Sequence, residues 1–490
     1  MLFRRDRGKP PTPPPAPPPV AARSSALDLD QTLLNFSGEG FTVRDACQGV
    51  QVFGATGSGK TSGSGRYLAM SYLAYGFGGL VLCAKPDERA LWEELAEMTA
   101  REDDLVVFDA TGEKHRFNFI DYEKNHAGDG VGLTANIVEL LTQIVKAIDR
   151  EEKDQGEKPF WKNALRQLTT AVIELASFAG LPLQFELLSD IVRSGPQSMQ
   201  QWSDPDWQRE SVCYQCIAEA ERLGGRDPEA EADFKKCRAY FVGDFAKLHP
   251  ETRSSIVLSF TMVVDLFNAR PLRQLLSSDT TLSPEDTFAG KIILLDLPIQ
   301  KYYRAGRIAQ FVWKYVWQRA VLRRQVTPDT RPVFLWADES QNFIGDFDPE
   351  FQAVARSARA CTVYLTQNLG MYKKALGEGS DNAVEAFLGN LQTKVFHQNS
   401  STETNEWAAE LFAKDWMTKT GTNSGFSQGG TSAGQNTTQE MNYQVPPITF
   451  TRLARGGPQS NRIVEGILYK GGTVFKATGM NYLPIQFKQQ

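Results

Sequence analysis

The stretch that decides the fold is VFGATGSGKTSGSGRY, residues 52–67. Residues 54–61 match G-x-x-x-x-G-K-[ST], in which glycines let backbone N–H groups turn toward an anion. The flanks agree, because residues 49–53 read as a buried strand and residues 66–75 as an apolar helix. Strand, glycine loop and helix together predict a phosphate-binding loop (P-loop) rather than a chance glycine turn.

The residues of this loop have distinct expected roles. Lys60 is expected to reach the β- and γ-phosphates of a nucleotide, and the Thr61 hydroxyl to help hold Mg²⁺. The helix that follows adds the positive end of its dipole. The residues expected to bind ATP are Gly54, Ala55, Thr56, Gly57, Ser58, Gly59, Lys60, Thr61 and Ser62.

A second segment, R-P-V-F-L-W-A-D-E-S-Q-N-F at residues 331–343, supplies carboxylates. Residues 333–336 read as a buried strand, and Asp338 and Glu339 follow its carboxyl end, where ligands bind in open parallel sheets. A P-loop needs one carboxylate to position Mg²⁺ and another group to orient and deprotonate water. Asp338 is expected to fill the first role and Glu339 the second.

Two further candidates come from the next strand and the helix before it. Residues 362–365 read as a parallel strand ending near Gln367, whose amide could sense the γ-phosphate or hold the attacking water; a polar turn that caps the strand is the alternative. Arg356 and Arg359 lie on the intervening helix, and one of them could act on a neighbouring subunit's phosphate as an arginine finger. Ordinary surface arginines are the plainer interpretation.

The spacing of the two motifs predicts an inserted domain. Lys60 and Asp338 lie nearly 280 positions apart, whereas a compact P-loop core needs only a few βα units of about 30 residues between its motifs. The intervening sequence has helical periodicity and little strand character. We therefore predict an α/β nucleotide-binding domain with a mainly parallel sheet, residues 26–125 and 277–490, and an inserted all-α domain, residues 126–276.

Two low-complexity segments stand apart from these domains. Residues 1–25 are proline-rich and predict a disordered tether. Residues 418–439 are rich in Ser, Thr and Gly and cannot build a core, which predicts a flexible surface loop. The same tract could touch phosphates near a channel, but its single lysine favours the surface loop.

Composition and charge limit the remaining possibilities. A net charge of −5 gives no global attraction for nucleic acid, so contact with DNA has to come from a local patch or from a channel made by several subunits. No signal peptide or membrane span is evident, and we expect a cytoplasmic protein. Cys213, Cys216 and Cys237 could suggest zinc, but a fourth ligand at finger-like spacing is missing, which favours buried thiols.

Taken together, the motifs resemble the type IV secretion coupling proteins of bacterial conjugation, the TraG/TraD-like members of the FtsK and HerA group of DNA-pumping ATPases. The resemblance covers about residues 38–480. It rests on G-A-T-G-S-G-K-T (54–61), A-K-P-D-E (84–88), P-F-W-K-N-A-L (159–165), A-D-E-S-Q-N-F (337–343), T-Q-N (366–368), T-K-V-F-H (393–397) and V-P-P-I-T-F-T-R-L-A-R-G (445–456).

This resemblance implies a RecA-like fold and Mg²⁺-dependent ATP hydrolysis that drives DNA or nucleoprotein translocation. It implies that Gln367 senses the γ-phosphate and that Arg356 acts in trans. The all-α domain would receive relaxase or other protein cargo. Six subunits would surround a DNA-sized channel and bind DNA without sequence specificity. In the absence of DNA the protein could be monomeric.

The resemblance has one departure. Family members commonly begin with transmembrane helices, whereas a proline-rich stretch stands in that place here. Three explanations fit this departure: a separate partner recruits the protein to the inner membrane, a mobile element uses a soluble version, or the protein has a non-secretory role in DNA processing. A nucleotide-gated recruiter of protein cargo and a scaffold ATPase of a mobile-element or defence assembly stay open as alternative functions.

Overall fold

The computed structural model describes residues 28–126, 132–149, 159–377, 379–427 and 430–489. The tether predicted at residues 1–25 lies outside this range. Among the described residues, nine strands form one sheet. Along the sheet they run in the order β13 (Tyr482–Lys488), β12 (Ile463–Lys470), β9 (Thr393–Phe396), β3 (Val50–Phe53), β8 (Ala360–Thr366), β7 (Val333–Ala337), β4 (Gly78–Leu82), β6 (Ile292–Asp296) and β5 (Leu105–Asp109).

The sheet is parallel from β9 to β5, and only β12 and β13 run antiparallel at one edge. Its strands are continuous apolar runs because both faces are covered. In β7, for example, Phe334 and Trp336 pack into the core on one face, while Val333 and Leu335 pack into the core on the other. This alternation follows from the two-residue period of a strand.

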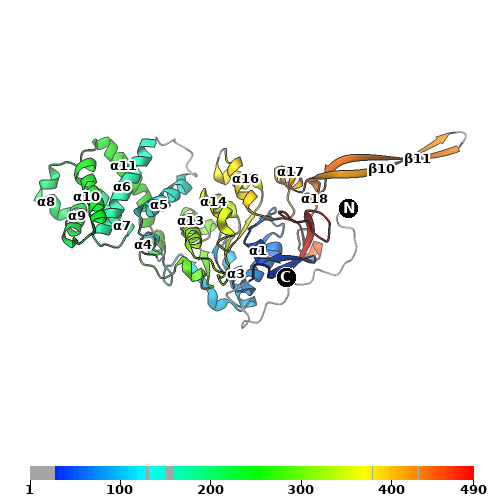
Figure 1. The fold of residues 1–490 in the computed structure, drawn as a ribbon, viewed down its shortest axis with the longest axis horizontal. Coiled ribbons are helices and arrows are strands. Elements are labelled where there is room, and N and C mark those ends of the chain that lie inside the picture. Colours follow the sequence, from blue (N-terminus) through cyan, green and yellow to red (C-terminus); the bar gives the residue numbers. More distant parts are fainter. Residues whose placement is uncertain (1–27, 127–131, 150–158, 378, 428–429, 490) are drawn as a thin grey trace.

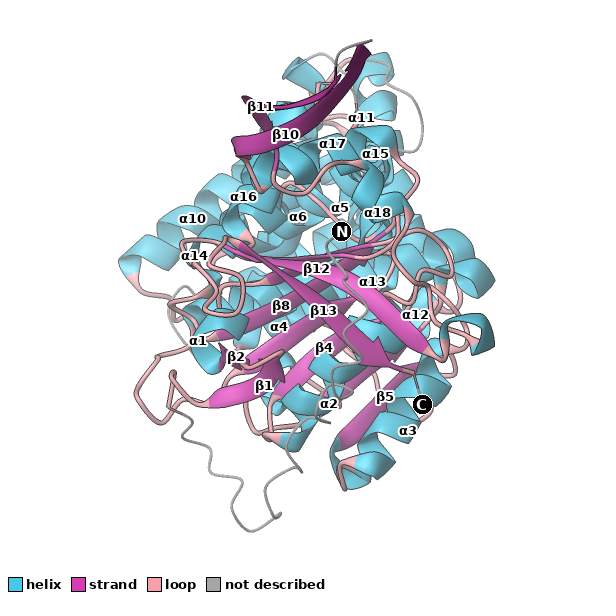
Figure 2. Ribbon diagram, turned by 90° about the vertical axis from the view of Figure 1, so that its right-hand side faces the viewer, coloured by secondary structure: helices cyan, strands magenta, loops and turns pink. Residues whose placement is uncertain are grey.

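Different helices cover the two faces of the sheet, with the parallel strands between them (Figure 2). The first face lies under α1 (Val43–Ala46), α2 (Arg66–Ala74), α3 (Glu88–Met98) and the hairpin of β1 (Thr32–Phe36) and β2 (Glu39–Thr42). The second lies under α13 (Ile299–Arg323), α14 (Phe347–Ala355), α15 (Leu369–Leu376), α16 (Asp381–Asn390), α17 (Thr402–Leu411) and α18 (Ile448–Thr451).

Between β5 and β6 the described chain forms helices and turns only. Leu168, Val172 and Leu175 form a buried stripe at steps of three and four residues on one of these helices, which fixes the face that packs inward. Figure 1 shows most of the helices gathered at one end of the molecule. They are α4 (Phe119–Asn125), α5 (Thr134–Asp149), α6 (Pro159–Phe178), α7 (Phe185–Arg193), α8 (Pro205–Glu210), α9 (Val212–Leu223), α10 (Pro228–Ala239), α11 (Pro250–Asn268) and α12 (Leu272–Leu276).

The predicted fold class, a mainly parallel α/β sheet with an all-α insertion, is therefore confirmed. The cysteines considered for zinc are buried in the insertion: Cys213 and Cys216 lie on α9, and the Cys237 thiol on α10 donates to the Ala171 carbonyl. The described residues hold no cluster of three or more His, Cys, Asp or Glu side chains arranged for a metal. They also contain no helix of the length and apolarity needed to cross a membrane.

The prediction of a loop at residues 418–439 is wrong. Residues 418–427 and 430–439 belong to a long antiparallel hairpin of β10 (Lys414–Ser427) and β11 (Gly430–Tyr443), which projects away from the body (Figure 1). Thr418, Thr420 and Thr422 alternate along β10, and threonine favours extended backbone. Cross-strand pairing satisfies the backbone polar groups, so the tract forms strands without building a core.

Candidate nucleotide-binding site

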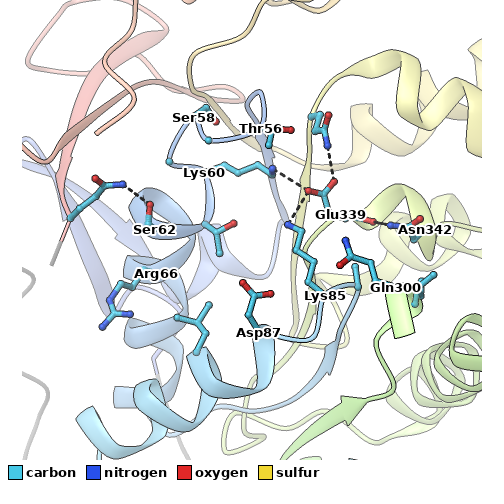
Figure 3. A pocket seen from close by; sticks show the side chains of 18 of the residues that line it. Thr56, Ser58, Lys60, Ser62, Arg66, Lys85, Asp87, Gln300, Glu339 and Asn342 are labelled. Carbon is cyan, nitrogen blue, oxygen red and sulfur yellow. Dashed lines mark hydrogen bonds and ion pairs between the residues drawn. The ribbon is translucent and has the colours of Figure 1, made fainter. Parts of the chain in front are cut away.

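The P-loop and the acidic pair meet at the carboxyl ends of the parallel strands. β3 leads into the P-loop, β7 ends just before Asp338, and β8 lies between them in the sheet. The Thr61 hydroxyl donates a hydrogen bond of 2.8 Å to Asp338 Oδ2, and Lys60 Nζ lies 3.4 Å from Glu339 Oε1. Two segments far apart in sequence therefore face one another in a single site (Figure 3).

The P-loop backbone is shaped by glycine where no other residue fits. Gly57 and Gly59 have φ angles of 72° and 86°, in the left-handed region. A Cβ on Gly59 would also lie 2.5 Å from the side chain of Val464 on β12. The Ser58 hydroxyl lines the cavity, is buried and has no hydrogen-bond partner among the described residues. A phosphate oxygen bound in the loop would satisfy it.

A buried histidine braces the start of the helix that follows the loop. Residues Thr61–Gly65 form a π-helical turn, and the Ser64 hydroxyl lies 2.7 Å from His397 Nε2. His397 Nδ1 lies 2.8 Å from the Glu465 carbonyl, which can only accept, so Nδ1 carries the proton and Nε2 accepts from Ser64. Burial lowers the pKa of His397 to about 4, which keeps the ring neutral.

Glu339 is held in place from several sides. Its φ of 48° is left-handed, a strained conformation of the kind found at active sites. Its Oε2 accepts from the side-chain amides of Gln341 at 2.9 Å and Gln367 at 3.3 Å. Burial alone would raise the pKa of Glu339, but the charge of Lys60, the Gln341 hydrogen bond and the charge of Lys85 lower it to about 2. The carboxylate is therefore anionic at neutral pH.

Lys85 was not predicted as a site residue. It follows β4 in the A-K-P-D-E segment, and its Nζ lies 3.0 Å from Glu339 Oε1 and 3.7 Å from Asp338 Oδ2. Glu88 Oε1 accepts from the backbone N–H groups of Ala84 and Lys85 and so fixes the turn that presents this lysine. The signal that could have found it is positional, since β4 is the neighbour of β7 in the sheet.

The site opens into a cavity of about 940 Å³, within the range of about 300–1,000 Å³ typical of small-molecule sites. Besides the P-loop, Lys85 and Glu339, the residues that line it include Asp87, Asn342 and Gln367. Thr61 and Asp338 offer the hard oxygen ligands that Mg²⁺ takes alongside water. The residues present therefore fit a magnesium nucleotide.

The structure does not bring Arg356 into this site. Arg356 ends α14, before the first residue of β8, whereas Gln367 follows the last. The seven residues of β8 separate the two ends by about 20 Å. Arg356 lines a second cavity, of about 420 Å³, together with Arg44 and Arg359. Any role of Arg356 in catalysis has to be exercised on another subunit.

Comparison with known proteins agrees with this geometry. Residues 332–455 match the family model described as "TraM recognition site of TraD and TraG". This segment begins just before β7 and includes the acidic pair, Gln367 and the β10–β11 hairpin. No curated protein sequence matches the chain.

Solved structures match almost the whole chain. The bacterial conjugative coupling protein TrwBdeltaN70, in an unbound form, is similar over 95% of this chain and 90% of its own, with a TM-score of 0.60 and 14% identity. TrwB in complex with ADP and Mg²⁺ matches over 95% and 90%, with a TM-score of 0.60 and 12% identity. The chain therefore has the fold of the conjugative coupling proteins, and its residues 332–455 resemble the corresponding part of TraD and TraG.

Proposed function

We propose that this protein is an ATPase that couples ATP hydrolysis to the movement of DNA or nucleoprotein in a conjugation-like transfer system. The observation that carries the proposal is the contact of Lys60 and Thr61 with Glu339 and Asp338, a complete set of phosphate, metal and water-orienting groups in one cavity. The match to the plasmid coupling protein TrwB, solved with ADP and Mg²⁺, with the ATP analogue ADPNP and with the GTP analogue GDPNP, supports a purine nucleotide as the ligand.

The side chains of the site have separable tasks in hydrolysis. Lys60 binds the β- and γ-phosphates, and Thr61 and Asp338 hold Mg²⁺, which neutralises charge on the transferring phosphoryl group when bound. A bound phosphate competes with Glu339 for Lys60. Loss of that contact leaves Oε1 with Lys85 as its remaining cation and lets it accept from, and deprotonate, a water. Gln367 follows β8 and donates to Glu339, and in this proposal it senses the γ-phosphate and reports cleavage to the neighbouring subunit.

The proposed assembly is a homo-hexamer around DNA, with Arg356 acting on the nucleotide of the adjacent subunit. The position of Arg356 about 20 Å from its own site supports this, because an arginine so placed contributes to catalysis only across an interface. Six subunits around a channel contact the phosphate backbone without reading bases.

Two surfaces are proposed for protein partners. The all-α domain, with predicted bounds at residues 126–276, receives relaxase or other cargo. Residues 332–455 contact an accessory protein of the transfer complex, since their family model is described as a TraM recognition site. The same description favours a second candidate function, a recruiter in which nucleotide state controls protein docking and little work is done on DNA.

Steady-state kinetics separate the two functions. ATP turnover is measured against protein concentration for the wild type and Lys60→Ala, each with and without single- and double-stranded DNA. A motor whose nucleotide sites lie between subunits has an ATP turnover per subunit that rises with protein concentration and with added DNA. The Lys60→Ala variant of such a motor has no ATPase activity. A wild-type rate indifferent to DNA supports the recruiter, and a rate that survives Lys60→Ala contradicts both.

A further inference from the structure

A basic and aromatic segment borders the nucleotide cavity on the side remote from the P-loop. Residues 299–307, I-Q-K-Y-Y-R-A-G-R, open α13 and contain three cations, and the chain has no Asp or Glu from residue 297 to 328. Lys301 and Arg304 are exposed, and the Tyr303 side chain, which lines the cavity, is 73% exposed. The apolar periodicity of the sequence predicts a helix over residues 307–323, whereas α13 begins at Ile299, so the sequence does not predict this segment.

Tyr303, whose side chain is exposed, has an unfavourable backbone conformation. Its φ of 46° and ψ of −122° interrupt α13, in a region that favours glycine and costs a larger residue about 1–3 kcal/mol. The flanking residues enforce this conformation. Lys301 and Tyr302 donate backbone hydrogen bonds to the Pro298 carbonyl, and Gly306 lies so close to Leu297 that an added Cβ would approach its carbonyl oxygen to 2.5 Å.

Tyr303 is not placed to hold the base of a nucleotide in its own site. The contacts of Lys60 and Thr61 with the carboxylates after β7 direct the γ-phosphate toward β7 and the base away from it. Tyr303 follows β6, which lies beyond β7 and β4 in the sheet. From β3 to β6 is four strand spacings, or about 19 Å. The exposed ring therefore faces a different ligand.

We propose that Tyr303, with Lys301 and Arg304, binds single-stranded DNA. An exposed aromatic ring beside cations, with no acidic neighbour in the chain, is the arrangement on which unstacked bases lie while cations contact the phosphates. Of the acidic side chains that line the cavity, Glu94 is paired with Arg66 and Glu339 with Lys60 and Lys85, while Asp87 directly precedes α3. This inference rests on the proposed DNA-translocating function and specifies the form of DNA and where it binds.

The segment is also bonded to the turn that carries Lys85. The Gln300 N–H donates to the Ala84 carbonyl at 3.2 Å. The Gln310 side chain accepts from Cys83 N–H at 2.7 Å and donates to the carbonyls of Cys83 and Leu297, both at 2.8 Å. A strand bound at Tyr303 thus acts, through residues 83–85, on the lysine that holds Glu339. DNA binding and ATP hydrolysis are coupled by this route.

The test compares the wild-type chain with Tyr303→Gly, Tyr303→Ala and Tyr303→Phe. Fluorescence anisotropy measures binding of a labelled oligo(dT) and of a duplex of equal length, and the ATPase rate with oligo(dT) is divided by the rate without it. Tyr303→Gly removes the ring while relieving the backbone, so it folds at least as stably as wild type. Tyr303→Phe keeps the ring and is the matched control.

We expect Tyr303→Gly and Tyr303→Ala to weaken oligo(dT) binding about tenfold or more, with the stimulation ratio falling toward one, and Tyr303→Phe to stay within about twofold of wild type. Three results overturn the inference. They are an unchanged oligo(dT) affinity in Tyr303→Gly, an equal loss of affinity for the duplex, and a loss of affinity for ADPNP alone. A wild type that hydrolyses ATP but ignores oligo(dT) overturns it too, and leaves the ATPase standing. A wild type without ATPase activity defeats the proposed function instead.

Discussion

Lys85 Nζ lies 3.0 Å from Glu339 Oε1, the same carboxylate oxygen that Lys60 approaches to 3.4 Å. Two lysines from different strands therefore share one anionic oxygen. We expect a nucleotide phosphate to draw Lys60 away and to leave Lys85 as the cation that keeps Glu339 charged and oriented. Lys85 is a positioning residue, set by the turn that Glu88 organises.

Substitution of Lys85 tests this role. In Lys85→Ala the kcat for ATP should fall about tenfold or more, because Glu339 loses a charge-assisted contact that orients it. The dissociation constant for ADPNP should change much less, since Lys60 still binds the phosphates. Lys85→Arg retains the charge and should recover part of kcat. Equal losses in binding and in kcat would instead make Lys85 a phosphate ligand.

Substitution of Glu339 separates binding from chemistry. Glu339→Gln keeps the shape of the side chain and its neighbours but removes the base, so kcat should fall by about 10²–10⁴. ADPNP should bind at least as tightly as in the wild type, because Lys60 is released from its carboxylate partner. Rapid-quench measurement of a single turnover reports the chemical step directly. A normal rate in Glu339→Gln would remove Glu339 from the chemistry.

His397 predicts how stability depends on pH. Its pKa is lowered from 6.5 to about 4 by burial, so the folded state resists protonation that the unfolded chain accepts. This pKa difference contributes up to about 3 kcal/mol to the free energy of unfolding. The contribution is complete above pH 6.5 and is lost as the pH falls from 6.5 to 4. Urea unfolding at pH 7.5 and 5 should show the loss in wild type. His397→Gln should show a smaller difference between the two pH values.

The lowered pKa of Glu339 acts in a separate window. Its stabilisation is present above pH 4.5 and is lost as pH falls toward 2, so it leaves the His397 comparison at pH 5 undisturbed. An equally steep pH dependence in wild type and His397→Gln would show that the ring is not the group responsible.

Mixed assemblies test whether Arg356 acts on a neighbour. Lys60→Ala and Arg356→Ala should each have little ATPase activity alone. In an equal mixture about a quarter of the interfaces combine an intact Lys60 with an intact Arg356 from the other subunit, so activity should reappear on mixing. Full activity of Arg356→Ala alone would make it a surface arginine.

The sequence predicts those parts of the site that are marked by short motifs next to strands, and it does not predict those that depend on the order of the strands in the sheet. The P-loop and Asp338–Glu339 are short motifs attached to apolar strands, and both the strands and the meeting of the motifs are predicted. Lys85 and His397 lie in A-K-P-D-E and T-K-V-F-H, two stretches that contribute to the family resemblance but predict no role for either side chain. Their roles arise because β4 lies beside β7 and β9 beside β3, and this strand order is a property of the whole sheet.

The hairpin and the start of α13 were missed for different physical reasons. Residues 418–439 lack the apolar period of a packed strand, and β10 and β11 are held together by backbone pairing, which leaves no pattern in the sequence. At α13 the helix is interrupted at Tyr303, and the exposed basic turn before it has no buried stripe to reveal it. The family resemblance predicts a trans-acting Arg356, and its position at the opposite end of β8 from Gln367 keeps it out of its own subunit's site.

The central claim is that one magnesium nucleotide is gripped by both motifs, and a crystal structure with ADP, Mg²⁺ and beryllium fluoride tests it most directly. The account predicts Lys60 on the fluoride that stands for the γ-phosphate, Thr61 and Asp338 both beside the metal, and Glu339 facing the fluoride through a water. Nucleotide bound away from Asp338, or a metal without either Thr61 or Asp338 near it, would contradict it.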